Sequence, residues 1–406
     1  MEKGSKKIDL MWVAYIFLLP FYVFRSGSVQ PATFAFAAAL GVLLARSKLR
    51  LPRNQLVSRA LNSPMAVMAL LVVLVLVIDG FWSIRLGSGE PIGFAIYYVF
   101  NFGLFIYGYI ALRENRFDFV NSTLYAVYAS VAFQVAASFV IPAPVDESRE
   151  ALFFNGCNQL AYWALSCACI VVVAQLNGFG RTTWNLLALA ACAWLTLLSL
   201  SKAGVGCIAI LMLIVFGTMP RRLLVGITLG TFLLFVVAGQ LGYLTRINDR
   251  FASTNQVFDN QIEGRGYDRI VNYPEYMVLG AGEGEVGRFR GALSDLGAEM
   301  HSAPGTMLFS YGVTGLALYA TFLFLVLMRS RGAQRLVVLL PLVYGFTHNG
   351  LRFSIAWIFF LFVIGCYVEI RLRAAAQARS PQKSVTAAPA LASRNGVHAP
   401  GGSALP

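Results

Sequence analysis

The sequence predicts an all-α, polytopic membrane protein with about twelve transmembrane helices. Of its 406 residues, 58% are hydrophobic and only 13% are charged, whereas about a quarter of the residues of a soluble domain are charged. The apolar residues fall in blocks of roughly 15–25, the length that crosses a bilayer as a helix. The net charge of +13 does not indicate nucleic-acid binding, because most basic residues stand in short connectors, where they orient helices.

Twelve apolar blocks define the expected spans. They cover residues 10–24, 31–45, 64–84, 92–112, 118–141, 157–176, 183–200, 203–219, 223–239, 303–328, 335–350 and 353–370. The first block follows three lysines, as in a signal peptide, but no small-x-small cleavage site comes after it, so we interpret it as a membrane helix. We expect a transmembrane domain over 1–373 and a disordered cytoplasmic tail over 374–406, which is rich in Ala, Pro, Ser and Gly.

The basic residues predict the orientation. With both termini in the cytoplasm, 21 of the 32 Lys and Arg residues lie on the inner side, as the positive-inside rule requires. The other eleven are Lys202 and ten arginines. Arginine grips phosphate or carboxylate through two parallel hydrogen bonds, which lysine cannot do. The alternative is that these loops merely reflect an arginine-rich genome.

One outer connector is far longer than the others. Residues 240–302, between the ninth and tenth spans, hold six arginines and nine acidic residues, a local net charge near −3. This excludes a polybasic membrane-surface patch, and the interleaved signs favour a folded element with specific partners for its arginines. A loop of this length among tight connectors is usually functional.

His301 is the candidate general base among three histidines. It stands where the long loop meets the tenth span, and its ordinary pKa near 6.5 suits proton transfer; the alternative is a helix-capping histidine. For His348 we expect a capping or interfacial role, and His398 lies in the tail. No second outer histidine has ligand spacing, so no zinc site is expected. The six cysteines show no metal-type spacing either and are expected to be small buried hydrophobes.

Three further segments carry polar residues near helix ends. Arg149 enters the sixth span from outside and is followed by Asn155, Gly156 and Asn158, which is costly unless these residues line a polar cavity. Lys202 follows the polar segment 199–201 between the seventh and eighth spans. Its side chain either extends to the membrane surface from a helix end or contacts a phosphate. The segment 280–285 is rich in glycine but acidic and without lysine, so it does not predict a nucleotide-phosphate loop.

These residues resemble the superfamily of bacterial O-antigen ligases and Wzy-type O-antigen or exopolysaccharide polymerases. His301-Ser302, nine residues and then Gly312-Val-Thr-Gly315 resemble the ligase signature of His, a polar residue, nine residues and Gly-x-x-Gly. Arg269, ten residues and Gly280 resemble the polymerase Arg-x10-Gly motif. The segment 149–158 resembles the Arg…Phe…Asn segment before a middle span. Ser201-Lys202-Ala203 resembles Ser-Arg-Gly, with lysine in place of the bidentate arginine.

The resemblance implies the fold, the location and the partners. It implies a fold like that of the lipid-dependent GT-C glycosyltransferases, in the bacterial inner membrane with the active face in the periplasm. The implied donor is a glycan on undecaprenyl diphosphate, and the acceptor is lipid A–core for a ligase or a second lipid-linked glycan for a polymerase. Members of the superfamily require no metal or nucleotide cofactor.

The implied mechanism gives each candidate residue a role. His301 accepts the proton of the acceptor hydroxyl as that hydroxyl attacks the anomeric carbon with inversion. Arginines stabilise the departing diphosphate; Arg149, Arg269 and Arg288 are the first candidates, and Arg265 and Lys202 the second. The histidine motif favours a ligase and the Arg269 motif a polymerase, so both stay open. A twelve-helix transporter or flippase is the alternative from another class; the sequence shows no inverted repeat, and Asp79 is the nearest to an intramembrane carboxylate.

Overall fold

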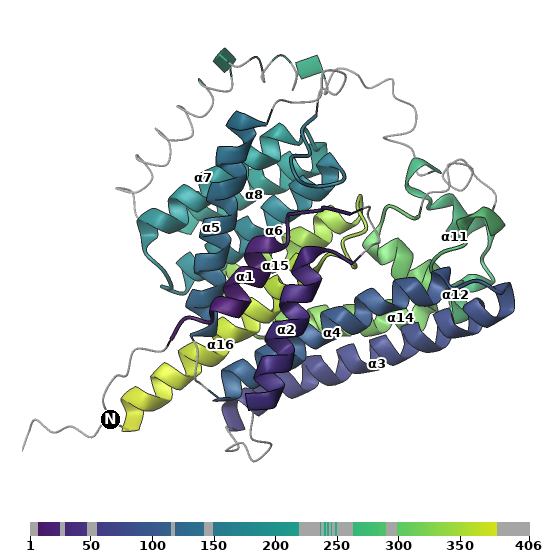
Figure 1. Ribbon diagram of the computed structural model, residues 1–406, viewed down its shortest axis with the longest axis horizontal. Coiled ribbons are helices and arrows are strands. Elements are labelled where there is room, and N and C mark those ends of the chain that lie inside the picture. Colours follow the sequence, from purple (N-terminus) through teal and green to yellow (C-terminus); the bar gives the residue numbers. More distant parts are fainter. Residues whose placement is uncertain are drawn as a thin grey trace, which may run out of the picture.

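The protein is a helical membrane protein. The computed structural model describes residues 7–24, 29–46, 55–114, 118–141, 149–218, 263–289 and 299–379, with a few single positions between 236 and 249. Every regular element in these ranges is a helix (Figure 1), as the sequence predicts. Six helices are long and apolar enough to cross a membrane, and four more are apolar but shorter. The ninth predicted span, 223–239, lies outside the described ranges.

The helices follow the predicted blocks in order. Their bounds are α1 Leu10–Leu18, α2 Pro31–Arg46, α3 Gln55–Leu86, α4 Glu90–Glu114, α5 Phe119–Val140, α6 Cys157–Leu176, α7 Thr182–Leu198, α8 Lys202–Thr218, α14 Ala303–Leu327, α15 Gln334–Gly345 and α16 Ser354–Arg379. Between α8 and α14, the long connector contains the short helices α11 Asp268–Asn272 and α12 Tyr276–Leu279 and two 3-10 turns, Glu263–Arg265 and Val286–Arg288.

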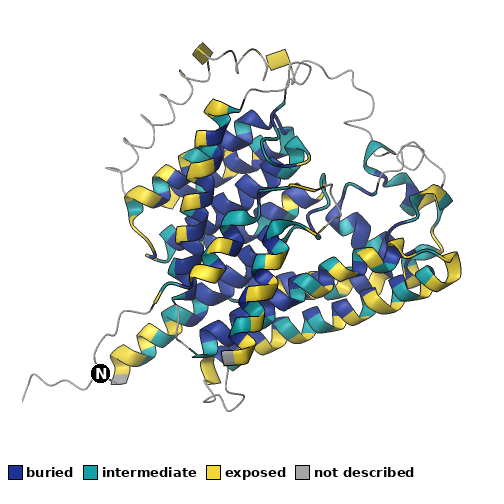
Figure 2. Ribbon diagram, viewed as in Figure 1, coloured by how far each residue is buried: buried dark blue, intermediate teal, exposed yellow. Residues whose placement is uncertain are grey.

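The burial pattern is that of a bundle surrounded by lipid. Helix α6 lies at the centre, and all of its residues from Leu160 to Ala174 are buried. Helix α3 runs along one side and presents an apolar stripe outward, in which Leu70, Val73 and Val77 are more than half exposed (Figure 2). Contiguous apolar surface of this kind is unfavourable in water and favourable against acyl chains.

Helix α3 begins nine residues earlier than predicted and passes through a proline. Pro64 has no N–H with which to bond the carbonyl of Ala60, four residues before it. The Arg329 side chain donates its Nε–H to that carbonyl at 2.5 Å. The hydrogen bond lost at the proline is therefore replaced by a side chain from the end of α14, and the helix continues.

Three other predicted boundaries are wrong, for local reasons. Helix α1 ends at Leu18 rather than at residue 24, because Pro20 has no N–H with which to continue the helical hydrogen bonds. Helix α15 ends at Gly345 instead of 350, and turns occupy 346–353. Helix α16 continues to Arg379, beyond the predicted tail boundary at 374, because the sequence 374–378 is Ala-Ala-Ala-Gln-Ala, a strong helix former.

Segments predicted on the same side of the membrane meet at the same end of the bundle. At one end, the Asp118 amide donates to the Lys7 carbonyl at 3.0 Å, and Arg373 stacks on Phe179. At the other end, the Tyr22 amide donates to Phe153 and the Glu150 amide to Leu198. We call the second the loop end, because the long connector docks there.

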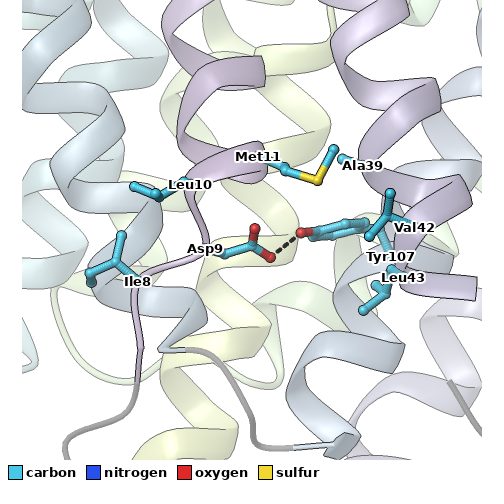
Figure 3. A pocket seen from close by; sticks show the side chains of 8 residues that line it. All are labelled: Ile8, Asp9, Leu10, Met11, Ala39, Val42, Leu43 and Tyr107. Carbon is cyan, nitrogen blue, oxygen red and sulfur yellow. Dashed lines mark hydrogen bonds between the residues drawn. The ribbon is translucent and has the colours of Figure 1, made fainter. Parts of the chain in front are cut away.

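A cavity of about 220 Å³ opens at the opposite end, between α1, α2 and α4 (Figure 3). Apart from Asp9 and Tyr107, its walls are apolar. The Tyr107 hydroxyl donates to Oδ2 of Asp9, and Oδ1 of the same carboxylate caps α1 through the Trp12 amide at 3.3 Å. The acid in this cavity is therefore part of the helix start.

Candidate functional site

His301 is held at the start of α14 by the long connector. Its amide donates to the carbonyl of Arg265 at 3.1 Å, and its side chain is half-buried. The neighbouring Ser302 caps the helix, accepting from the Gly305 amide at 3.0 Å. The Tyr267 hydroxyl donates to Ser302 Oγ at 2.6 Å. Because Ser302 performs the capping, the His301 imidazole is not required for it.

His348 lies beside His301 and Arg265. Burial, together with electrostatic interaction with these two neighbours, lowers the pKa of His348 from 6.5 to about 3. Its ring packs against Tyr162, Tyr344 and Phe353 at centroid distances of 5.6–5.7 Å. The buried Nε2 has no hydrogen-bond partner among the described residues. His348 is thus a neutral imidazole next to the candidate base, where the sequence predicted only a capping or interfacial role.

The turn that carries His348 is tied to the connector. The Arg265 guanidinium donates to the carbonyl of Thr347 at 2.7 Å, and the Tyr267 hydroxyl lies 2.8 Å from the carbonyl of Phe346. Residues 265–267 therefore bridge the start of α14 and the end of α15, which brings one arginine and two histidines together.

Arg149 and Lys202 lie on the adjoining helix ends. Arg149 donates to the Ser199 carbonyl at 3.0 Å and to Oδ1 of Asn158 at 2.8 Å. The Tyr344 hydroxyl lies 3.1 Å from both the Asn158 carbonyl and the Ser201 hydroxyl. Lys202 follows Ser201 as the first residue of α8. Since the Tyr344 ring also packs on His348, a chain of contacts leads from Arg149 to His348 and includes Ser201, the residue before Lys202.

The other two predicted arginines lie in a separate aromatic environment. Arg269, in α11, is buried with its guanidinium 5.7 Å from the Phe289 ring. Arg288 lies over the rings of Trp82 and Phe289 at 4.7 and 4.6 Å. Its Nη2 lies within hydrogen-bond distance of three backbone carbonyls, those of Ala281, Gly282 and Gly284, whereas its buried Nε and Nη1 have no hydrogen-bond partner among the described residues. Burial lowers the pKa of each guanidinium, and the nearby Glu299 partly offsets this. Both arginines fold the connector.

Two motif glycines hold this segment against a kink in α14. Gly312 has φ +69° and ψ −176°, which breaks the helix. The amides of Ala281 and Gly282 donate to the Phe309 and Ser310 carbonyls at 2.9 and 2.8 Å, carbonyls that precede the kink. A Cβ on Gly312 would lie 2.3 Å from the Val278 carbonyl oxygen, and one on Gly280 would lie 2.4 Å from that of Ser310. The motif spacing therefore reflects backbone-to-backbone packing.

A buried polar cluster lies where the connector meets α3, α4 and α14. We call Asp79, Tyr98, Glu283, Tyr311 and Arg352 the carboxylate cluster. Both acids are essentially inaccessible, at 0% and 1% exposure. Oδ1 of Asp79 accepts the amide of Glu283 at 3.0 Å. Oε1 of Glu283 lies 2.5 Å from the Tyr98 hydroxyl. The Tyr311 hydroxyl is 3.0 Å from both carboxylates.

Arg352 supplies the positive charge of this cluster. Its Nε donates to Oε2 of Glu283 at 2.7 Å, and its guanidinium lies 3.9 Å from the Phe94 ring centroid. Glu299 is 3.9 Å from the same guanidinium and accepts the Gly284 amide at 2.9 Å. Burial raises the pKa of Glu299, and the neighbouring arginine opposes that rise. Burial lowers the pKa of Arg352, but the negative charges of Glu283 and Glu299 outweigh this effect and raise the pKa above its ordinary value.

Sequence reasoning missed the carboxylate cluster, although two signals pointed to it. Asp79 stood out as an ionisable residue in an apolar block, which by default marks a functional or structural polar site. The second signal is the segment 280–285, whose acidic side chains do not suit a phosphate loop but can enter a buried polar cluster. Within the described ranges, no three His, Cys, Asp or Glu side chains are placed to hold a metal ion.

The comparisons with known proteins leave the family open. A scan against models of protein families and a search of curated protein sequences each found no match for this chain.

Proposed function

We propose that the chain is a membrane glycosyltransferase of the O-antigen ligase type. In this proposal it moves a glycan from undecaprenyl diphosphate to a sugar hydroxyl at the loop end of the bundle, on the periplasmic side of the bacterial inner membrane. The observation that carries the proposal is the grouping of His301, His348 and Arg265, with Arg149 and Lys202 on the adjoining helix ends. A base beside several cations suits attack by a hydroxyl on a carbon that bears an anionic leaving group.

The reaction is a displacement with inversion. The acceptor oxygen forms a bond to the anomeric carbon while the bond from that carbon to the diphosphate oxygen breaks. His301 takes the acceptor's proton, and the electron pair of the broken bond leaves on the diphosphate. General-base assistance of this kind contributes roughly 10²–10⁴-fold in rate.

The geometry changes which cations suit the leaving group. Arg265 adjoins His301, and Arg149 is linked to His348 through Asn158 and Tyr344. Arg269 and Arg288 lie against Phe289 of the connector, away from the two histidines. We therefore place Arg265 and Arg149 at the diphosphate, with Lys202 as a point charge beside them. Preorganised donors of this type contribute about 3–4 kcal/mol each in a transition state.

His301→Ala tests the proposal. In a strain that lacks the gene, the variant should fail to restore the surface glycan, although the protein inserts and accumulates normally. His398→Ala, a change in the C-terminal tail, is the matched control and should restore it fully. Full complementation by His301→Ala would exclude the role of this side chain.

The product that accumulates in the deletion strain identifies the reaction. Lipid-linked polymer above a bare lipid A–core indicates a ligase, whereas single repeat units on the lipid indicate a polymerase. Unchanged glycan with altered uptake of a solute would favour a transporter and contradict the proposal.

A further inference from the structure

The carboxylate cluster contains three contacts between a phenol oxygen and a carboxylate oxygen, but its two tyrosines supply only two protons. The Tyr311 hydroxyl is 3.0 Å from Oδ2 of Asp79 and 3.0 Å from Oε1 of Glu283, but a phenol has one proton and can donate to only one of them. If both acids are ionised, one carboxylate oxygen faces a lone pair of the phenol. Glu283 is already supplied by Tyr98 and Arg352. The salt bridge with Arg352 favours the charged form of Glu283, so the missing proton belongs on Oδ2 of Asp79.

A single proton completes this network. On Oδ2 of Asp79 it gives a continuous chain, in which Asp79 donates to the Tyr311 oxygen and Tyr311 donates to Glu283. Oδ1 of Asp79 still accepts the amide of Glu283. Every polar group in the chain then has a partner, as buried polar groups generally do.

The charge balance points the same way. Two fully buried acids, Asp79 and Glu283, share one guanidinium, that of Arg352, and an uncompensated buried charge is strongly unfavourable. The titratable and charged groups on the elements around Asp79 and Glu283 are Arg85 on α3, Glu90 and Tyr98 on α4, Tyr276, Glu285, Arg288 and Glu299 on the connector, Tyr311 on α14 and Arg352 before α16. Arg288, another cation near the cluster, directs its Nη2 at backbone carbonyls.

We propose that Asp79 is a proton-binding site and that its proton fixes residues 280–289 to the bundle. When the proton leaves at alkaline pH, two adjacent carboxylates repel each other, and the Glu283 amide and carboxylate lose their position on α3. The segment that this loosens is the one that packs on the kink of α14 through Ala281 and Gly282. The inference does not depend on the proposed glycosyl transfer.

Hydrogen–deuterium exchange of the full-length protein in lipid nanodiscs tests the proposal. The amides of Ala281, Gly282 and Glu283 report docking directly, because each donates to a named acceptor. After correction for the intrinsic rate, their exchange should accelerate by up to about tenfold for each pH unit between the pKa of Asp79 in the undocked segment and its pKa in the docked one, and level off above the latter. Protection that stays constant from pH 5 to pH 10 would overturn the inference.

Two substitutions make the result specific. Asp79→Asn supplies a permanent N–H donor to Tyr311 and no charge, so exchange should stay slow over the whole pH range. Glu90→Gln removes the charge of an exposed carboxylate that accepts the Glu285 amide; the glutamine carbonyl oxygen can still accept that amide, so the pH dependence of the wild type should be unchanged. Loss of that dependence in Glu90→Gln, or its persistence in Asp79→Asn, would contradict the assignment.

Infrared spectroscopy of the wild type requires no variant. The carbonyl stretch of a buried, protonated carboxylic acid should be present at pH 7 and should disappear at alkaline pH. Its absence at pH 7 would show that Asp79 is ionised, and the proposal would fail whether or not Asp79→Asn folds.

Discussion

At the scale of single residues, Gly280 and Gly312 are explained by how closely two backbone segments approach. Each glycine faces a carbonyl of the other segment, and neither site has room for a Cβ. Their places in recognisable motifs therefore do not require that they touch a substrate. The same motifs place His301 and Arg269 at the ends of this packed unit, so spacing that serves folding also fixes the position of the candidate base.

Gly312→Ala should destabilise the protein strongly. The residue has φ +69° and ψ −176°, a region that costs a residue with a Cβ about 1–3 kcal/mol, and the Cβ would also overlap the Val278 carbonyl. The apparent Tm in detergent should fall by several degrees. Gly287→Ala is the control, because a Cβ there meets nothing within 4 Å. Equal Tm values for the two variants would contradict this account of the kink.

His348 should make stability depend on pH on the acid side. Its folded pKa is about 3, against 6.5 for an ordinary histidine, so the unfolded chain takes up a proton first as the pH falls. Stability is therefore lost as the pH falls from about 6.5 towards 3. Thermal unfolding should show a smaller loss of Tm between pH 7 and pH 5 in His348→Gln than in the wild type. Identical losses would mean that His348 carries a charge in the folded protein.

At the scale of elements, the sequence predicted the helices better than their ends or their contacts. The apolar blocks of the sequence located α3 to α8 and α14 to α16, because a helix in lipid must be apolar both where it packs on other helices and where it faces acyl chains. Pro64 did not end α3, since the side chain of Arg329, 269 residues after Ala60 in sequence, supplies the missing donor to the Ala60 carbonyl. The kink of α14 was equally unpredictable, because the amides that stabilise it come from the connector.

The candidate site was predicted in part. The sequence directed attention to His301 and to the helix ends that bear Arg149 and Lys202, and the structure places these residues at the same end of the bundle. It did not distinguish arginines that face the histidines from arginines that fold the connector, because Arg265, Arg269 and Arg288 lie in one acidic and glycine-rich stretch. The distinction arises from Trp82 and Phe289, which enclose Arg288 and come from different parts of the chain.

Arg288→Lys and Arg265→Lys should therefore have different effects. Lysine cannot reproduce the planar stack or the contacts to three carbonyls at Arg288, so that change should lower stability by about 1–3 kcal/mol. Arg265→Lys should leave the Tm nearly unchanged and, under the proposed function, reduce turnover by about 10²-fold or more. Tm and glycan-transfer rates measured on the same preparations check both. A lower Tm in Arg265→Lys with unchanged turnover would reverse the two roles.

At the scale of the whole molecule, sidedness follows from which segments meet. The basic connectors share one end of the bundle, and the segments that hold His301, Arg149 and Glu283 share the other. We expect the loop end to face away from the cytoplasm, because positively charged connectors are retained inside.

Labelling of introduced cysteines tests this orientation. The background is Cys157→Ser, because the other five cysteines are buried. A membrane-impermeant thiol reagent should modify Gly89→Cys, between α3 and α4, in intact cells. Arg331→Cys, between α14 and α15, should react only after the membrane is opened; both positions are exposed. The reverse pattern would show the opposite orientation, with the histidines on the cytoplasmic side.

The carboxylate cluster also has a consequence for biogenesis. Asp79 leaves the ribosome 204 residues before Glu283, which gives it a backbone donor, and before both Tyr311 and Arg352. For most of the time that synthesis takes, Asp79 therefore lies on α3 without these partners, in or beside the insertion machinery. A neutral, protonated Asp79 enters lipid more easily than a carboxylate. The proton that later fixes the connector would thus already be in place when the helix first enters the bilayer.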